Sequence, residues 1–197
     1  MHKLVIASNN PGKLRELQLT LASLSIEILT QAQLGIDEAE EPHCTFIENA
    51  LAKARHVSRI SGLPALADDS GLCVDALGGA PGVQSARYAG EPKSDSRNNE
   101  KLLQAMEGVV DRRAHYYCVL VLVRHADDPQ PLIAEAEWHG EIAQQTRGEG
   151  GFGYDPLFWL PQLNKMSAEL SRDEKAQISH RAQALHILLQ RLQIAAY

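Results

Sequence analysis

The sequence has few cysteines, few aromatic residues and no long apolar run. Its three cysteines, Cys44, Cys73 and Cys118, stand far apart and form no C-x-x-C pair, which argues against a disulfide framework or a zinc site. The longest apolar run, residues 116–123, is too short to span a bilayer, and the first residues do not follow the pattern of a signal peptide. We therefore expect a cytoplasmic protein with no membrane partner.

Basic residues are also in deficit. The 19 lysines and arginines stand against 25 aspartates and glutamates, so the formal net charge is −6. An acidic surface repels a polyanion, which argues against long nucleic acid as a partner. A small anion such as a free nucleotide stays compatible with this charge, because a metal ion and a few lysines at one site decide such binding locally.

What the sequence does contain is the composition of a globular protein. Its 197 residues are 44% hydrophobic and 22% charged, enough for a full core, and we treat residues 1–197 as one domain. Residues 3–8 read as a buried strand, and residues 9–24 read as a helix with Asn10 as N-cap. A second helix is expected between Thr45, which forms a capping box with Glu48, and Gly62.

The rest of the chain alternates between the two kinds of element, which is typical of an α/β protein. The expected segments are strands at 63–67 and 72–77 with an acidic turn at 68–71, a loop at 78–90, a helix at 94–108, a hairpin at 112–143 and helical structure from 167 onward. No internal repeat or interdomain linker is visible.

Lys13 follows Gly12 shortly after the first strand, a position that often serves a phosphate. The Walker A pattern nevertheless fails on both sides of this pair. Ser8, Asn10 and the backbone N–H groups can still hold an anion, because they stand at the positive end of a helix dipole. The alternative is an ordinary capped helix with a solvated lysine.

Residues 148–153 match G-x-G-x-x-G, the dinucleotide-binding pattern. That pattern must open a helix, and Pro156 in the following segment prevents one, so we reject this reading. The stretch is better interpreted as a flexible backbone that presents Phe152 and Tyr154 to a flat ligand, followed by the carboxylate of Asp155. The alternative is a hairpin turn with two core aromatic residues.

Asp68 and Asp69 end an apolar strand, where carboxylates are costly unless they bind a metal, act as a base or accept hydrogen bonds. An acidic stretch, residues 37–41, lies nearby in the sequence. Oxygen ligands of this kind favour Mg²⁺, which is usually shared with substrate phosphates. The alternative for residues 37–41 is a solvated acidic loop.

His180 and Arg181 fall in the first turn of the last helix, after Ser179 as N-cap. A cation in this place opposes the helix dipole, which hints at a binding role, although an exposed and frayed turn is the simpler explanation.

A series of short motifs, in a fixed order, carries the strongest signal. They are SNNPGK, AEE, TFIENALAKA, ADDSGL, LGGAPGVQSARYAG, GGFGYDP, AELSRDEK and ISHRAQAL. Together they resemble the inosine triphosphate pyrophosphatase family, above all its bacterial members, from residue 4 to about residue 190. Members of that family hydrolyse deaminated purine nucleoside triphosphates (ITP, dITP and XTP) to a monophosphate and pyrophosphate, which cleanses the nucleotide pool.

The resemblance implies a three-layer α/β/α fold with a long, mixed central sheet, two lobes around a cleft, a homodimer and a Mg²⁺ requirement. It also implies that Asp69 is the catalytic base and that Asp69, with Glu40 or Glu41, holds the metal. The first motif and Lys53 would hold the triphosphate, Ser70 would contact substrate, and the later motifs would form the base and sugar pocket. The implied substrate-binding residues are Ser8, Asn9, Asn10, Pro11, Gly12, Lys13, Lys53, Ser70, Phe152, Gly153, Tyr154, Asp155, Lys175, His180 and Arg181.

Selectivity would follow from the 6-position of the purine, which is an acceptor in hypoxanthine and a donor in adenine. A pocket lined with donors such as His180, Arg181 or backbone N–H groups would reject ATP. Three rivals stay open: a pyrophosphatase for modified pyrimidines, a nucleotide sensor without turnover, and a single-strand binder using Tyr88, Phe152 and Trp159 that the negative charge disfavours.

Overall fold

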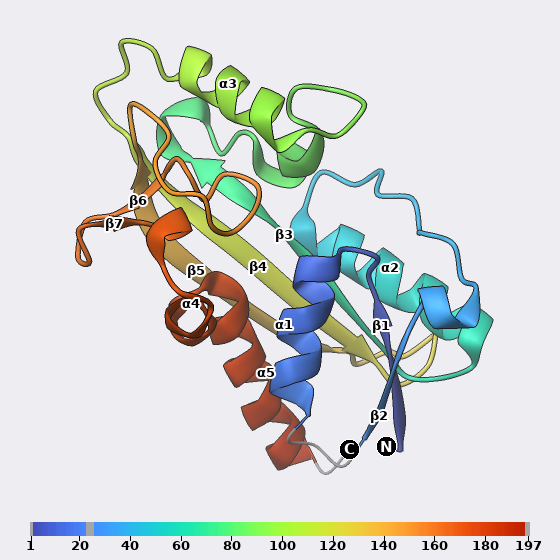
Figure 1. The fold of residues 1–197 in the computed structure, drawn as a ribbon. Helices are drawn as coiled ribbons and strands as arrows, with labels where there is room; N and C mark the ends of the chain where they lie inside the picture. The colour runs from blue at the N-terminus through green and yellow to red at the C-terminus, as the bar shows by residue number, and fades with distance from the viewer. Residues whose placement is uncertain (1, 23–25, 196–197) are drawn as a thin grey trace. The chain divides into compact units, whose positions relative to one another are not determined.

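The computed structural model describes residues 2–22 and 26–195 (Figure 1). Its helices and strands alternate along the chain, as expected for an α/β protein. In chain order they are β1 (Lys3–Ala7), α1 (Pro11–Leu21), β2 (Glu27–Thr30), α2 (Phe46–Ser61), β3 (Ala65–Val74), α3 (Asp95–Ala105), β4 (Arg113–Val123), β5 (Leu132–Ile142), β6 (Phe158–Leu160), β7 (Lys165–Met166), α4 (Arg172–Ile178) and α5 (His180–Ala195).

One seven-stranded sheet runs through the chain in the order β2-β1-β3-β4-β5-β6-β7. The first strand pairs in parallel with β2 and β3, whereas β6 pairs antiparallel with β5 and β7. The sheet is therefore mixed, and the predicted α/β class is confirmed.

The chain divides into two compact units. Unit 1 comprises Met1–Asp69, Cys118–Ala136 and Arg181–Tyr197, and unit 2 comprises Ser70–Tyr117 and Glu137–His180. Strands β3, β4 and β5 contribute residues to both units, so neither unit is a continuous piece of sequence. The two units are described one at a time.

In unit 1, both faces of the sheet are covered by helices. Leu4 and Ile6 of β1 belong to a core shared with α1 and α5, which lie side by side in Figure 1. Side chains alternate between the two faces of a strand, so Val5 and Ala7, both fully or almost fully buried, face the other side, where α2 contacts β1. Unit 1 is thus an arrangement of three layers, α/β/α.

In unit 2, the core is rich in aromatic side chains. Tyr116 of β4, Trp138 of β5 and Phe158 of β6 pack together, and Leu102 of α3 belongs to the same cluster. Tyr154 also belongs to this cluster, so the aromatic core includes part of the loop that the sequence predicts to present a ligand.

Local signals predicted most helix boundaries. The first helix starts after its N-cap Asn10, and α2 lies between Thr45 and Gly62, whose φ of 69° ends it. The helix predicted over 9–24 ends at Leu21, and residues 23–25 lie outside the described residues. Within the described ranges, no helix is long and apolar enough to cross a membrane.

One prediction about the fold is wrong. Residues 68–71 do not form a turn between two strands, because Asp68 and Asp69 lie inside the continuous strand β3. Aspartate, serine and glycine are typical of turns, but pairing within the sheet outweighs this local preference. The correction decides which way the two aspartates point.

Candidate active site

The N-terminus of α1 has the form expected of an anion site. The Asn10 side chain accepts hydrogen bonds from the backbone N–H groups of Gly12 (2.9 Å) and Lys13 (3.1 Å), and the Asn10 N–H donates to Ser8 Oγ (3.2 Å). Asn9, Asn10 and Pro11 are exposed. Residues 8–13 thus form an ordered, accessible turn at the positive end of a helix dipole.

Lys13 is not a solvated lysine on this turn. Its ammonium forms an ion pair with Asp68 Oδ1, and its side chain is only 16% exposed. The Asp68 side chain is fully buried and also accepts a hydrogen bond from Arg181 Nε at 2.9 Å. Burial alone would raise the pKa of Asp68, but Arg181 and Lys13 outweigh it and hold that pKa well below its usual range. Asp68 is therefore an ionised carboxylate between two cations.

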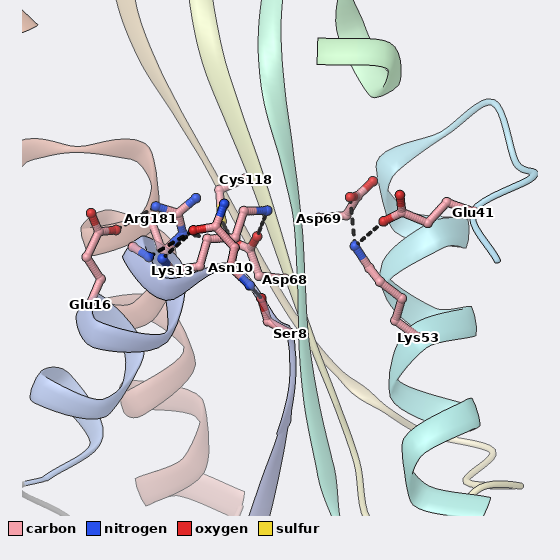
Figure 2. Close-up of polar contacts among 11 residues, drawn as sticks. Ser8, Asn10, Lys13, Glu16, Glu41, Lys53, Asp68, Asp69, Cys118 and Arg181 are labelled. Atoms are coloured by element: carbon pink, nitrogen blue, oxygen red, sulfur yellow. Dashed lines mark hydrogen bonds and ion pairs between the residues drawn. The ribbon is translucent and has the colours of Figure 1, made fainter. Parts of the chain in front are cut away.

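Asp69 points to the opposite face of the sheet, toward α2 (Figure 2). Its Oδ1 lies 2.8 Å from Lys53 Nζ, and the same ammonium lies 2.7 Å from Glu41 Oε1. Burial raises the pKa of Asp69, and the attraction of Lys53 offsets only part of this effect. Of the two glutamates predicted to share a metal with Asp69, Glu41 is thus the one brought near it, whereas the Glu40 side chain is exposed.

The aspartates are therefore not one metal-binding pair. Successive side chains of a strand point to opposite faces, and the continuous strand β3 separates Asp68, which faces α1 and α5, from Asp69, which faces α2. Ser70 follows in the strand and is half-buried.

In unit 2, the glycine-rich loop is organised around Asp155. This buried carboxylate accepts hydrogen bonds from Ser167 Oγ (2.8 Å) and from the Phe152 backbone N–H (2.9 Å), and it forms an ion pair with Lys175. Gly151 has a φ of 78°, and a Cβ there would lie 2.0 Å from Asp155 Oδ2. The loop needs glycine at this position, and β6 rather than a helix follows it, which confirms the rejection of a dinucleotide fingerprint.

The two aromatic residues of this loop have different environments. Phe152 is 39% exposed, the Lys175 ammonium lies 5.0 Å from its ring centroid, and the ring lines a pocket of about 500 Å³ in unit 2. Tyr154 is buried in the core, and its hydroxyl donates to the Ser85 carbonyl at 2.8 Å. Stacking on a base is thus open to Phe152, and the predicted stacking role of Tyr154 is not supported, because its ring is enclosed by the core.

Other predicted pocket residues are also held by neighbours. Gly153 accepts a hydrogen bond from Asn99 and donates one to Asp95. His180 is buried and its ring stacks on Tyr116, with the ring centroids 4.8 Å apart.

The family resemblance predicts that Arg181 lies in the base pocket, but the structure places its guanidinium beside Asp68 in unit 1. Its Nε donates to Asp68 and its Nη1 donates to Glu16. Recognition of a base by these two N–H groups is therefore not supported, because both already serve carboxylates.

Sequence reasoning missed several residues that hold the site. Glu16 pairs with Arg181, and helical spacing could have placed Glu16 on the same face of α1 as Lys13, although not beside Arg181. Ser167 and Asp95 hold the loop from segments distant in sequence, and no local pattern marks them.

The mixed sheet, with lysines and carboxylates gathered where β1 ends, defines an α/β protein whose site is suited to a polyanion and its counter-cation. The chain belongs to the Ham1 family, whose model matches residues 4–191. The family resemblance carried by the motifs is thereby confirmed.

The chain is similar to named relatives over nearly its whole length. The chain is 63% identical to the dITP/XTP pyrophosphatase of Ralstonia nicotianae, with 98% of each chain covered. It is 64% identical to that of Nitrosomonas europaea, with 98% of this chain and 95% of the relative covered. Among solved structures it is similar to a HAM1 protein from Coxiella burnetii, with a TM-score of 0.94, 47% identity, and 98% of this chain and 99% of that chain covered.

Proposed function

We propose that the protein hydrolyses deaminated purine nucleoside triphosphates, namely dITP, ITP and XTP, to the monophosphate and pyrophosphate. The observation that carries this proposal is the convergence of Asp69 and Glu41 on one cation position in unit 1. The names of the relatives, dITP/XTP pyrophosphatase at 63% and 64% identity, supply the substrate class.

The carboxylates fit the Mg²⁺ ion that we include in the proposal. Asp69 Oδ1 and Glu41 Oε1 already share one cation, the Lys53 ammonium, at 2.8 and 2.7 Å. Hard oxygen donors suit Mg²⁺, which commonly takes one or two carboxylates plus substrate phosphates and water. Across residues 2–22 and 26–195, no group of three or more His, Cys, Asp or Glu residues could hold a metal, so the substrate would have to complete the shell.

Bound Mg²⁺ would supply charge neutralisation at the phosphate oxygens. The N-terminus of α1 and the Lys13 ammonium would bind the triphosphate. Asp69 would accept a proton from a water whose oxygen attacks the α-phosphorus, and its raised pKa favours this role. The bond from the α-phosphorus to the bridging oxygen breaks, and the bonding electrons leave with pyrophosphate. Lys53, released from the two carboxylates, would be free to contact the phosphates.

Selectivity would depend on unit 2. Phe152 would stack on the base, and the Lys175 ammonium, held by Asp155 and close to the Phe152 ring, is a donor for the 6-oxo group. Adenine carries an amino group there, so a donor would face a donor and ATP would bind poorly.

A substrate panel tests the proposal. The protein should release pyrophosphate from dITP, ITP and XTP in the presence of Mg²⁺, lose this activity in EDTA and regain it when Mg²⁺ is restored. Phosphorus-31 spectra should show a monophosphate and pyrophosphate as first products. A nucleoside diphosphate with orthophosphate, or equal rates on ATP and dITP, would contradict the proposal, and turnover of modified pyrimidines alone would favour the pyrimidine enzyme.

We also propose that the protein acts as a homodimer in the cytoplasm, as the family resemblance implies. Light scattering at working concentrations should give twice the mass of the chain, and a mass of one chain would refute the dimer.

A further inference from the structure

Asp68 has no role in the proposed chemistry, yet it is the most enclosed carboxylate of the unit 1 cluster. Its side chain is fully buried on the face of β3 opposite Asp69. A buried ionised carboxylate is costly unless cations and hydrogen bonds compensate it. Its partners therefore show what it does.

Those partners hold the carboxylate from several sides. Asp68 Oδ2 accepts from Arg181 Nε at 2.9 Å and from Cys118 Sγ at 3.2 Å, while Oδ1 pairs with the Lys13 ammonium. Arg181 is itself 3% exposed and paired with Glu16. Two of these partners, Arg181 and Cys118, are themselves packed in the core, so the position of the carboxylate is fixed.

Among the side chains that contact Asp68 directly, Lys13 is the most exposed. Its side chain is 16% exposed, against 0% for Asp68 and 3% for Arg181, and it rises from the accessible turn at the start of α1. An ammonium has three N–H donors, so an ion pair with Asp68 leaves donors for a phosphate. A lysine held at one end loses less side-chain freedom when a ligand binds.

We propose that Asp68 is a positioning residue for the reaction, which fixes the Lys13 ammonium where the pyrophosphate part of the substrate binds. This inference rests on the proposed function. Two adjacent aspartates then have different tasks. Asp69 acts on the attacking water, and Asp68, on the opposite face of β3, holds the cation that binds phosphate.

The direction in which one inhibition constant changes tests the idea. Charge alone predicts that Asp68→Asn, which removes a negative charge beside Lys13, strengthens the binding of an anion. Positioning predicts the opposite. We expect the inhibition constant of inorganic pyrophosphate to rise about tenfold, with kcat for dITP falling more than KM rises. In a Lys13→Met background, Asp68→Asn should cause no further change, because the group it positions is gone.

Two further variants distinguish the effect of the carboxylate's position from the effects of its charge and of misfolding. Asp68→Glu keeps the charge but displaces the carboxylate, so its inhibition constant should also rise, and this variant decides the matter if Asp68→Asn fails to fold. Cys118→Ala removes only a weak thiol donor and leaves Arg181 and Lys13 on the carboxylate, so its inhibition constant should stay within about twofold of wild type. Circular dichroism and thermal melting identify folded variants.

An unchanged or lower inhibition constant in folded Asp68→Asn or Asp68→Glu, or additive effects with Lys13→Met, would overturn the positioning role while leaving the proposed function intact. Wild-type protein that releases no pyrophosphate from dITP would overturn both.

Discussion

The substitution Asp155→Asn would test how the glycine-rich loop of unit 2 is held. Asp155 is 2% exposed, and its two oxygens serve Ser167, the Phe152 backbone and Lys175. Asparagine has the same shape but lacks the charge, and it has one oxygen and one N–H₂ group in place of two oxygens. The Ser167 hydroxyl can turn and accept from the amide N–H₂, so the remaining oxygen would still face Phe152 and Lys175.

The expected loss of stability comes from the negative charge, which asparagine cannot restore. Removing one charge from a buried ion pair costs about 3–5 kcal/mol. The retained oxygen still accepts a bond, and the Lys175 side chain, 14% exposed, can shift its charge toward water, so we expect the lower end, about 3 kcal/mol. For a chain of this size that loss lowers Tm by roughly 6–12 °C.

Urea denaturation followed by circular dichroism measures this loss, with Ser167→Ala as the matched control. The control removes one neutral hydrogen bond to the same carboxylate and should cost only about 1 kcal/mol. If Asp155→Asn were no more destabilising than Ser167→Ala, the carboxylate charge would not be what fixes the loop.

Four further variants or conditions test the site. Asp69→Asn should lower kcat for dITP by about 10² or more, since general-base catalysis has that worth, and near wild-type turnover would remove Asp69 from the mechanism. Phe152→Ala should raise KM for dITP by roughly tenfold with little change in stability, because the ring is 39% exposed, and an unchanged KM would exclude stacking. Lys53→Met should strengthen Mg²⁺ binding without nucleotide, measured by calorimetry, because it frees Asp69 and Glu41 from an ammonium; equal affinities would show that Lys53 does not compete. The pKa of Asp68 is lower in the folded protein than in the unfolded chain, where it is about 4. Ionised Asp68 therefore stabilises the fold at pH values above about 4, and this stabilisation is lost as the pH falls through the folded pKa. The stability gap between wild type and Asp68→Asn should therefore be larger at pH 7 than near pH 3, and a gap independent of pH would refute the ion cluster.

Helix ends could be predicted because their signals are local. Asn10 caps α1 through its own side chain, and Thr45 accepts from the Glu48 N–H three residues later, so each signal and its partner lie within one turn. Strand β3 could not be predicted in the same way. Its residues 68–71 favour a turn by composition, and only pairing with distant strands keeps them extended.

The same distinction holds for the candidate site. The motifs identified Lys13, Lys53, Asp69 and the loop around Asp155 as chemically important. They did not reveal that Lys13 pairs with Asp68, which is distant in the sequence. Nor did they reveal that Arg181 of the last helix pairs with the same carboxylate. Nor did they separate exposed Phe152 from buried Tyr154, since both follow a glycine in the same loop.

The class of fold, the ends of the capped helices and the set of charged groups available for chemistry could all be predicted, because they depend on composition and on neighbours within a few residues. Long-range packing, in contrast, sets which carboxylate faces which lysine and which aromatic ring stays exposed. The direction of a side chain from a strand or loop depends on pairing and packing with segments far away in the chain, and no short pattern contains that information.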